Sequence, residues 1–190
     1  MPARTGAELG RIVAPQTVRV ERFLPAPPDR VWQYLTESGL RRRWLAGGLM
    51  EPQAGGKVEH LFRHAELSAE PNPPRYAGFA DSPAMPGKVT VWEPPQRLAY
   101  SWPGDGGVSE VVFELSPDGA GTRLVLTHVR LADRDTMVSV ASGWGAHLGI
   151  LDDVLAGRPP RGFWSEHARL EALHEAAFAP AADTARETSP

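Results

Sequence analysis

Proline and glycine residues divide this chain into short segments, and this division constrains the fold more than any other feature of the sequence. Breaks stand at Pro25–Pro28, Gly55–Gly56, Pro94–Pro95 and Gly157–Pro160. Because proline lacks the N–H group that sheet ladders and helix interiors use, regular structure is expected to end at these positions. The longest stretch with a helical period is 136–156. The sequence therefore predicts a series of short elements followed by one long helix.

Alternating apolar residues predict strands between these breaks. Leu98, Tyr100 and Trp102 share one face of such a segment, because successive side chains of a strand point to opposite sides. The last three segments are separated by short turns, which predicts an antiparallel meander. The predicted strands are residues 17–24, 57–64, 87–93, 97–102, 108–115 and 122–130.

Two short helices are predicted between the first two strands. Pro28 suits the first turn of one of them, whose apolar face holds Val31 and Leu35. The second covers 39–44 and is expected to present Arg41–Arg43 to solvent. The long helix at 136–156 contains three glycines, each of which costs about 1 kcal/mol relative to alanine and must be offset by packing.

The order of these elements predicts an α+β fold, in which a curved antiparallel sheet wraps around the long C-terminal helix. Asp133 or Asp135 is expected to cap this helix, and an additional C-terminal helix is predicted at 165–178. A curved sheet that grips one helix leaves a cavity between them, which is the expected ligand site. The proline-rich segment 65–86 is predicted to be a long loop that could act as a lid.

Composition excludes several classes of protein. The chain has no cysteine, which excludes disulfides, thiolate nucleophiles and cysteine-ligated metals. A formal net charge of −3 argues against a general nucleic-acid binder. No apolar run reaches the roughly 18 residues of a membrane span, and we expect a cytoplasmic protein. Spacing also argues against a metal at His60 and His64, which lie about 13 Å apart along a strand.

No catalytic residues and no cofactor are predicted. The glycines between Gly143 and Gly149 do not have the spacing of a dinucleotide-binding loop, and no strand leads into them. The neighbouring carboxylates Asp152 and Asp153 are expected to point to different sides of the helix.

Aromatic and histidine side chains on the predicted inner faces are the candidate ligand-binding residues. Flat apolar rings with a few polar atoms suit an apolar or aromatic ligand, although ordinary core packing and hydrogen-bonded core histidines would produce the same pattern. The Tyr100 hydroxyl is the first candidate for a polar contact with the ligand. The candidate residues are Trp44, His60, Phe62, Tyr100, Trp102, Phe113, His128, Trp144 and His147.

Five segments together resemble the START-like superfamily, also called the Bet v 1-like or polyketide cyclase and lipid transport group. Within it, they resemble the branch named for the activator of Hsp90 ATPase homologue 1. The segments are APPDRVWQYLTESGLRRRW, AGGKVEHLF, GKVTVWEPPQRLAYSW, SEVVFEL with GTRLVLTHV, and GWGAHLGILDDVLAG. The resemblance covers about 17–157 and implies a helix-grip fold. The loop 65–86 and the helix after Trp164 extend beyond the family's core pattern.

The expected organisation along the chain has four parts. They are a flexible tail at 1–16, a helix-grip domain at 17–157, a C-terminal helical extension at 158–178 and a second flexible tail at 179–190.

Three functions are compatible with the sequence. The first is binding of a small hydrophobic or aromatic molecule between the sheet and the long helix, without catalysis. The second is a cyclase, aromatase or hydrolase on the same scaffold, which would need His60, His128 or His147 within hydrogen-bond reach of Tyr100 or of a water in the pocket. The third, implied by the resemblance, is a protein-interaction module with a chaperone partner. Trp92 and residues 165–178 are candidate surfaces for a homodimer.

Overall fold

A seven-stranded antiparallel sheet forms the body of the protein, in the order β1-β2-β7-β6-β5-β4-β3. The computed structural model describes residues 9–79, 83–104 and 106–180. β6 pairs with β5 on one side and β7 on the other, as the predicted meander requires. The strands are β1 (Arg11–Ala14), β2 (Thr17–Leu24), β3 (Lys57–His60), β4 (Met85–Glu93), β5 (Arg97–Gly104), β6 (Gly107–Asp118) and β7 (Gly121–Val129).

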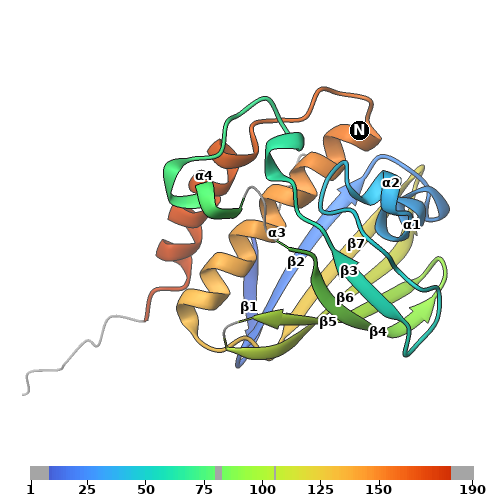
Figure 1. The fold of residues 1–190 in the computed structure, drawn as a ribbon, viewed down its shortest axis with the longest axis horizontal. Helices are drawn as coiled ribbons and strands as arrows, with labels where there is room; N and C mark the ends of the chain where they lie inside the picture. The colour runs from blue at the N-terminus through green and yellow to red at the C-terminus, as the bar shows by residue number, and fades with distance from the viewer. Residues whose placement is uncertain (1–8, 80–82, 105, 181–190) are drawn as a thin grey trace, which may run out of the picture.

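The long helix α3 (Arg134–Leu155) crosses one face of this sheet, and α4 (Phe163–Ala177) lies on the side of α3 away from it (Figure 1). The short helices α1 (Pro28–Thr36) and α2 (Ser38–Arg41) lie together beyond one end of the strands (Figure 1). This arrangement confirms the predicted α+β helix-grip fold. Within the described residues, none of the helices combines the length and apolar character needed to cross a membrane.

The three glycines of α3 have different surroundings. A Cβ atom on Gly145 would lie 2.7 Å from Cδ1 of Leu170, and one on Gly149 would lie 3.1 Å from Cδ of Arg161. These two glycines allow α4 and the segment before it to approach the helix. A Cβ atom on Gly143, by contrast, would meet nothing within 4 Å. Gly143 therefore borders open space within an otherwise packed structure.

Gly145→Val and Gly143→Ala are expected to change stability in opposite directions. Valine at 145 forces Leu170 and α4 outward, which costs about 1–3 kcal/mol by overpacking. Alanine at 143 adds helix propensity without a clash and raises the free energy of unfolding by about 0.5–1 kcal/mol. Urea denaturation of both variants measures the difference. A stable Gly145→Val variant with an unchanged midpoint would contradict this account of the α3–α4 contact.

The N-terminal segment differs from its prediction. Residues 11–14, expected to lie within a flexible tail, form β1 and pair with β2, and Gln16 turns the chain with a φ of 55°. All four residues of β1 are exposed, so main-chain hydrogen bonding holds the strand in place without the alternating burial that reveals strands in a sequence. Of the two predicted tails, residues 1–8 and 181–190 lie outside the described residues. The division into a domain at 17–157 and an extension at 158–178 stays a prediction.

Arg41 is buried, whereas its position in a run of three arginines predicted exposure. Its guanidinium donates hydrogen bonds to the carbonyl groups of Thr36, Ala46, Gly47, Gly48 and Glu59. These bonds connect the segment that follows α2 to the edge strand β3, which contains Glu59. The predicted elements here are also shorter than expected: α2 ends at Arg41 and β3 ends at His60.

The described parts of the predicted loop are 65–79 and 83–86. The end of the loop prediction is wrong, because β4 already begins at Met85 and its first residues pair with β3. The part at 65–79 is bonded to the first turn of α4. Ser68 Oγ accepts a hydrogen bond from the Phe163 N–H at 3.1 Å. The Glu70 carboxylate accepts from the N–H groups of Trp164 (2.8 Å) and Ser165 (3.0 Å) and from the Ser165 hydroxyl. Because the first N–H groups of a helix have no partner within the helix, these side chains cap α4 from a distant part of the chain.

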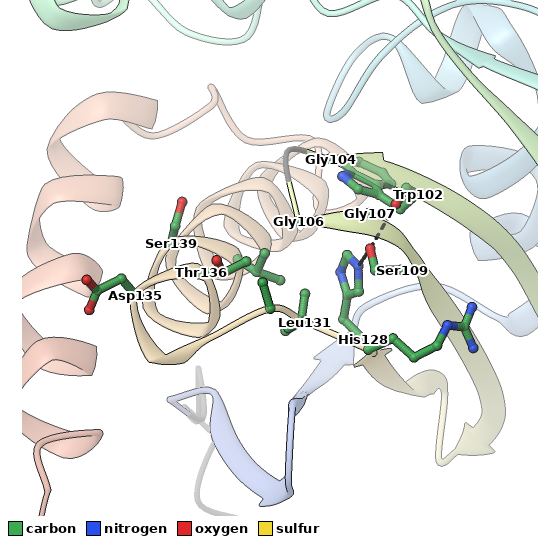
Figure 2. A pocket seen from close by; sticks show the side chains of 13 residues that line it. Trp102, Gly104, Gly106, Gly107, Ser109, His128, Leu131, Asp135, Thr136 and Ser139 are labelled. Atoms are coloured by element: carbon green, nitrogen blue, oxygen red, sulfur yellow. Dashed lines mark hydrogen bonds between the residues drawn. The ribbon is translucent and has the colours of Figure 1, made fainter.

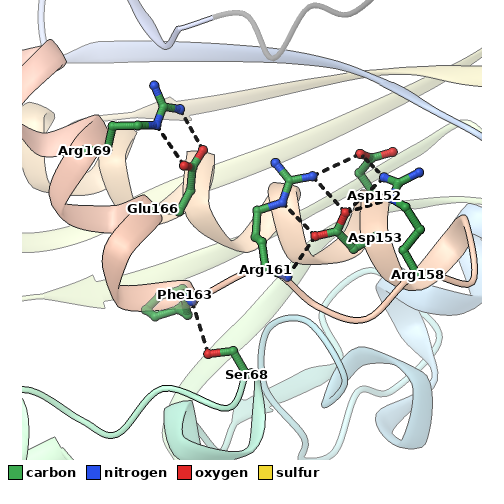
Figure 3. A network of polar contacts seen from close by, with 8 residues as sticks. All are labelled: Ser68, Asp152, Asp153, Arg158, Arg161, Phe163, Glu166 and Arg169. Atoms are coloured by element: carbon green, nitrogen blue, oxygen red, sulfur yellow. Dashed lines mark hydrogen bonds and ion pairs between the residues drawn. The ribbon is translucent and has the colours of Figure 1, made fainter.

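A network of charged side chains fastens the chain between α3 and α4 (Figure 3). Arg161 Nε and Arg158 Nη2 contact the Asp153 carboxylate at 2.7 Å and 3.0 Å, and Arg158 also contacts Asp152 at 2.7 Å. The Asp153 side chain is only 7% exposed. The two carboxylates thus share the same arginines, contrary to the expectation that they point apart, because the chain after Gly157 turns back across them.

Candidate functional site

A pocket of about 320 Å³ lies between α3 and the sheet, and we call it the aromatic pocket. Its wall combines aromatic rings from the sheet side with one face of α3. The rings of Trp102 and Trp144 lie 5.2 Å apart, and Phe62 stacks on His64 at 5.5 Å. The lining residues are Leu45, Phe62, His64, Trp102, His128, Ser139, Val140, Gly143, Trp144 and His147.

A second pocket of about 370 Å³ adjoins it, between the β5–β6 hairpin and the first turns of α3 (Figure 2). The two pockets share Trp102, His128, Ser139 and Val140 in their walls. The second pocket is more polar, since Arg130 and Asp135 also line it. The aromatic pocket, in contrast, has no charged arginine, lysine, aspartate or glutamate among its described lining residues.

Both ring nitrogens of His128 are occupied by hydrogen bonds. Trp144 Nε1 donates to His128 Nδ1 at 3.0 Å, which places the ring proton on Nε2. His128 Nε2 then donates to Ser109 Oγ at 2.8 Å, and that hydroxyl donates to the Trp102 carbonyl at 2.9 Å (Figure 2). Burial lowers the pKa of His128 to about 4. His128 therefore braces the two tryptophans of the pocket and has no nitrogen left for a ligand.

His147 has one occupied nitrogen and one without a partner. Its Nδ1 lies 2.7 Å from the carbonyl oxygen of Trp44. A carbonyl only accepts hydrogen bonds, so Nδ1 carries the proton and Nε2 is an acceptor. Among the described residues Nε2 has no hydrogen-bond partner, although the residue is only 6% exposed. Burial lowers the pKa of His147 to about 3, so the ring is neutral at physiological pH.

Two further histidines lie close to the pocket. His64 begins the short 3-10 helix η1 (His64–Glu66) and packs against His147 at 5.6 Å and Phe163 at 5.1 Å. Burial lowers its pKa to about 4. His60 is fully buried between Tyr100 and Trp102, and neither of its ring nitrogens has a hydrogen-bond partner among the described residues. Burial lowers the pKa of His60 to about 3.

The structure divides the candidate ligand residues into two groups. Phe62, Trp102, His128, Trp144 and His147 line the aromatic pocket. The others, Trp44, His60, Tyr100 and Phe113, lie behind this lining as part of the core. Phe113, for example, packs edge-on against Trp144 at 5.6 Å. Tyr100 is 1% exposed and burial raises the pKa of its hydroxyl, so the polar side chains that a ligand could contact are instead those of His64, Ser139 and His147, which line the pocket.

Several lining residues were absent from the sequence prediction: Leu45, His64, Ser139, Val140 and Gly143. One signal could have identified part of this set. Ser139, Gly143 and His147 are spaced four residues apart, which places them in a line along one helix face. The alternating pattern places His64 on the strand predicted at 57–64, whereas the chain has already left β3 at that point.

Metal-ligand groupings and the basicity of the histidines describe the chemistry of the site. Within the described ranges, no group of three or more His, Asp or Glu side chains could hold a metal ion. The histidines around the pocket have pKa values of about 3 to 4, which makes them weak bases at neutral pH. His60 packs against the Tyr100 ring at 4.9 Å, but this is a ring contact and not a hydrogen bond.

Comparisons with known proteins agree with this fold. A family model described as "Activator of Hsp90 ATPase homolog 1-like protein" matches residues 25–156. The NMR structure of a protein encoded by gene BPP1335 from Bordetella parapertussis is similar, with 46% sequence identity, 87% of each chain covered and a TM-score of 0.75. No curated protein matches the chain.

Two more distant structures share the fold alone. The crystal structure of CalU16 from Micromonospora echinospora is 24% identical, with 86% of this chain and 89% of that chain covered and a TM-score of 0.66. A crystal structure from Rhodobacter sphaeroides is 23% identical, with 78% of this chain and 97% of that chain covered and a TM-score of 0.61.

Proposed function

Since the chain belongs to the activator of Hsp90 ATPase homolog 1-like family of START-like proteins, we propose that it binds a small aromatic molecule in the aromatic pocket. The observation that carries this proposal is the open space beside Gly143, in a pocket that the rings of Trp102 and Trp144 also line. A glycine in the middle of a long helix lowers the stability of the helix relative to alanine. A pocket that binds a ligand would explain why this position has no side chain.

The size of the pocket favours a ligand of about two fused rings. Cavities of roughly 150 Å³ accept benzene, and small-molecule sites begin at roughly 300 Å³. At about 320 Å³ the aromatic pocket lies at the lower end of that range. Trp102 and Trp144 provide flat faces and edges, which favour an aromatic ligand over a flexible acyl chain.

The hydrogen bonds around the pocket support binding in preference to catalysis. His128 uses both ring nitrogens to hold Trp144 and Ser109, and His147 uses one to hold the Trp44 carbonyl. A general base would combine an accessible nitrogen with a pKa near neutrality, and burial moves these rings away from that range. The cytoplasmic location and a chaperone partner stay predictions that follow from composition and family.

Titration with a bicyclic aromatic probe tests the proposal. We expect naphthalene, indole or 1-naphthol to shift the indole N–H NMR signals of Trp102 and Trp144 saturably, because both rings line the pocket. The signal of Trp92 is the internal control. Trp92 does not line the pocket, and its ring packs against that of Trp32 with 5.2 Å between the ring centroids. If none of the three probes shifts either signal up to its solubility limit, the proposal is wrong.

A further inference from the structure

We propose that the aromatic pocket selects uncharged ligands that carry a hydrogen-bond donor, such as a phenol, and that this donor binds Nε2 of His147. This inference rests on the proposed function, since it describes the ligand of the same pocket. The inference specifies the chemical class of the ligand and the protein atom that binds its donor group.

The first step is the assignment of the ring proton. The distance of 2.7 Å between His147 Nδ1 and the Trp44 carbonyl oxygen requires an N–H at Nδ1. The Trp44 carbonyl is itself held, because the N–H group of the same peptide unit, that of Leu45, donates to the Arg41 carbonyl at 2.9 Å. A fixed carbonyl fixes the tautomer of His147, and Nε2 is left with a lone pair.

The second step concerns the surroundings of that lone pair. His147 is packed between Phe163, at 4.7 Å between ring centroids, and His64, at 5.6 Å. None of the described residues donates a hydrogen bond to Nε2. His147 lines the pocket and is only 6% exposed, so Nε2 is an acceptor that a ligand inside the pocket can reach. The apolar rings around it lower the local polarity, which strengthens a hydrogen bond donated to it.

The third step excludes anionic ligands. The described lining of the aromatic pocket contains no lysine or arginine to pair with a carboxylate. Burial keeps both His147 and His64 uncharged, with pKa values of about 3 and 4. An anion would lose its hydration without gaining a counter-charge, whereas a neutral hydroxyl loses little.

The test compares three naphthalene derivatives with nearly the same body. We expect 1-naphthol to bind roughly 3- to 10-fold more tightly than 1-methoxynaphthalene, which has no donor, and naphthalene-1-carboxylate to bind most weakly. Isothermal titration calorimetry measures the three affinities. Equal binding of naphthol and ether, or tighter binding of the carboxylate, overturns the inference and leaves the proposed function intact. Absence of binding by all three overturns both.

Two variants connect the preference to Nε2. His147→Asn keeps an N–H near the Nδ1 position for Trp44 and removes the acceptor, so the affinity ratio of naphthol to ether should fall to about one. His147→Gln places an amide oxygen near the Nε2 position and should restore part of the preference.

In the wild-type protein, the ¹⁵N signal of Nε2 should shift with 1-naphthol and not with the ether. This measurement decides the matter if either variant fails to fold, and an unchanged signal overturns the inference.

Discussion

Gly143→Leu is expected to close the aromatic pocket and lower the affinity for 1-naphthol at least ~10-fold, equivalent to ~1.4 kcal/mol, while the fold is retained. A Cβ atom at this position meets nothing within 4 Å, so the leucine side chain extends into the pocket instead of into packed protein. Leucine also has a much higher helix propensity than glycine, which supports α3. Calorimetric titration measures the affinity, and the thermal midpoint reports on the fold.

The matched control is Gly143→Ala. Its single methyl group removes the glycine's conformational freedom but leaves most of the pocket open, so binding should fall only slightly. A Gly143→Leu protein that is folded and still binds 1-naphthol with wild-type affinity would place the ligand elsewhere on the molecule.

Asp153→Asn is expected to lower the free energy of unfolding by about 3 kcal/mol. The substitution leaves the Arg161 and Arg158 guanidinium groups facing a neutral amide at a position that is 7% exposed. Asp152→Asn is the matched control, since Asp152 is 29% exposed and contacts the same two arginines. For that control we expect a loss below about 1 kcal/mol, and urea denaturation at pH 7 compares the two. Equal losses would contradict the special role of Asp153.

The Asp153 carboxylate should also contribute to the pH dependence of the free energy of unfolding in acid. Hydrogen bonds from Arg161 and Arg158 outweigh the opposing effect of burial and hold the pKa of Asp153 at about 2, below the 3.8 expected when the chain is unfolded. A depressed folded-state pKa contributes stability above the unfolded value, and this contribution is lost as pH falls from about 4 towards 2. It amounts to about 2 kcal/mol. In the Asp153→Asn variant, the free energy of unfolding should lack this additional decrease between about pH 4 and pH 2.

The pattern of the sequence was sufficient for most of the fold. The strand predicted at 17–24 is β2, and the helix predicted at 136–156 is α3 with Asp133 as its cap, since the Asp133 carboxylate accepts from Thr136 N–H at 2.8 Å. Such elements follow from local periodicity and capping. β1 could not be predicted in this way, because its exposed residues carry no pattern and only pairing with β2 defines it.

The site was predicted less completely, for a different reason. Periodicity identifies which side chains face inward, and the aromatic residues were found by this criterion. Whether an inward residue lines a pocket or lies behind it depends on the tertiary packing, as Tyr100 and Trp102 show within one strand. Likewise, the buried state of Arg41 depends on carbonyl groups as distant as that of Glu59, which no local pattern encodes.

The cap on α4 has a consequence for how a ligand exchanges with solvent. Ser68 and Glu70 belong to the segment that continues from η1, and His64 of η1 forms part of the pocket wall while it packs on Phe163. Displacing this wall therefore also strips the first turn of α4 of its acceptors. We expect this coupling to hold the His64 side of the pocket in place, although α4 contributes no residue to the described lining of the pocket.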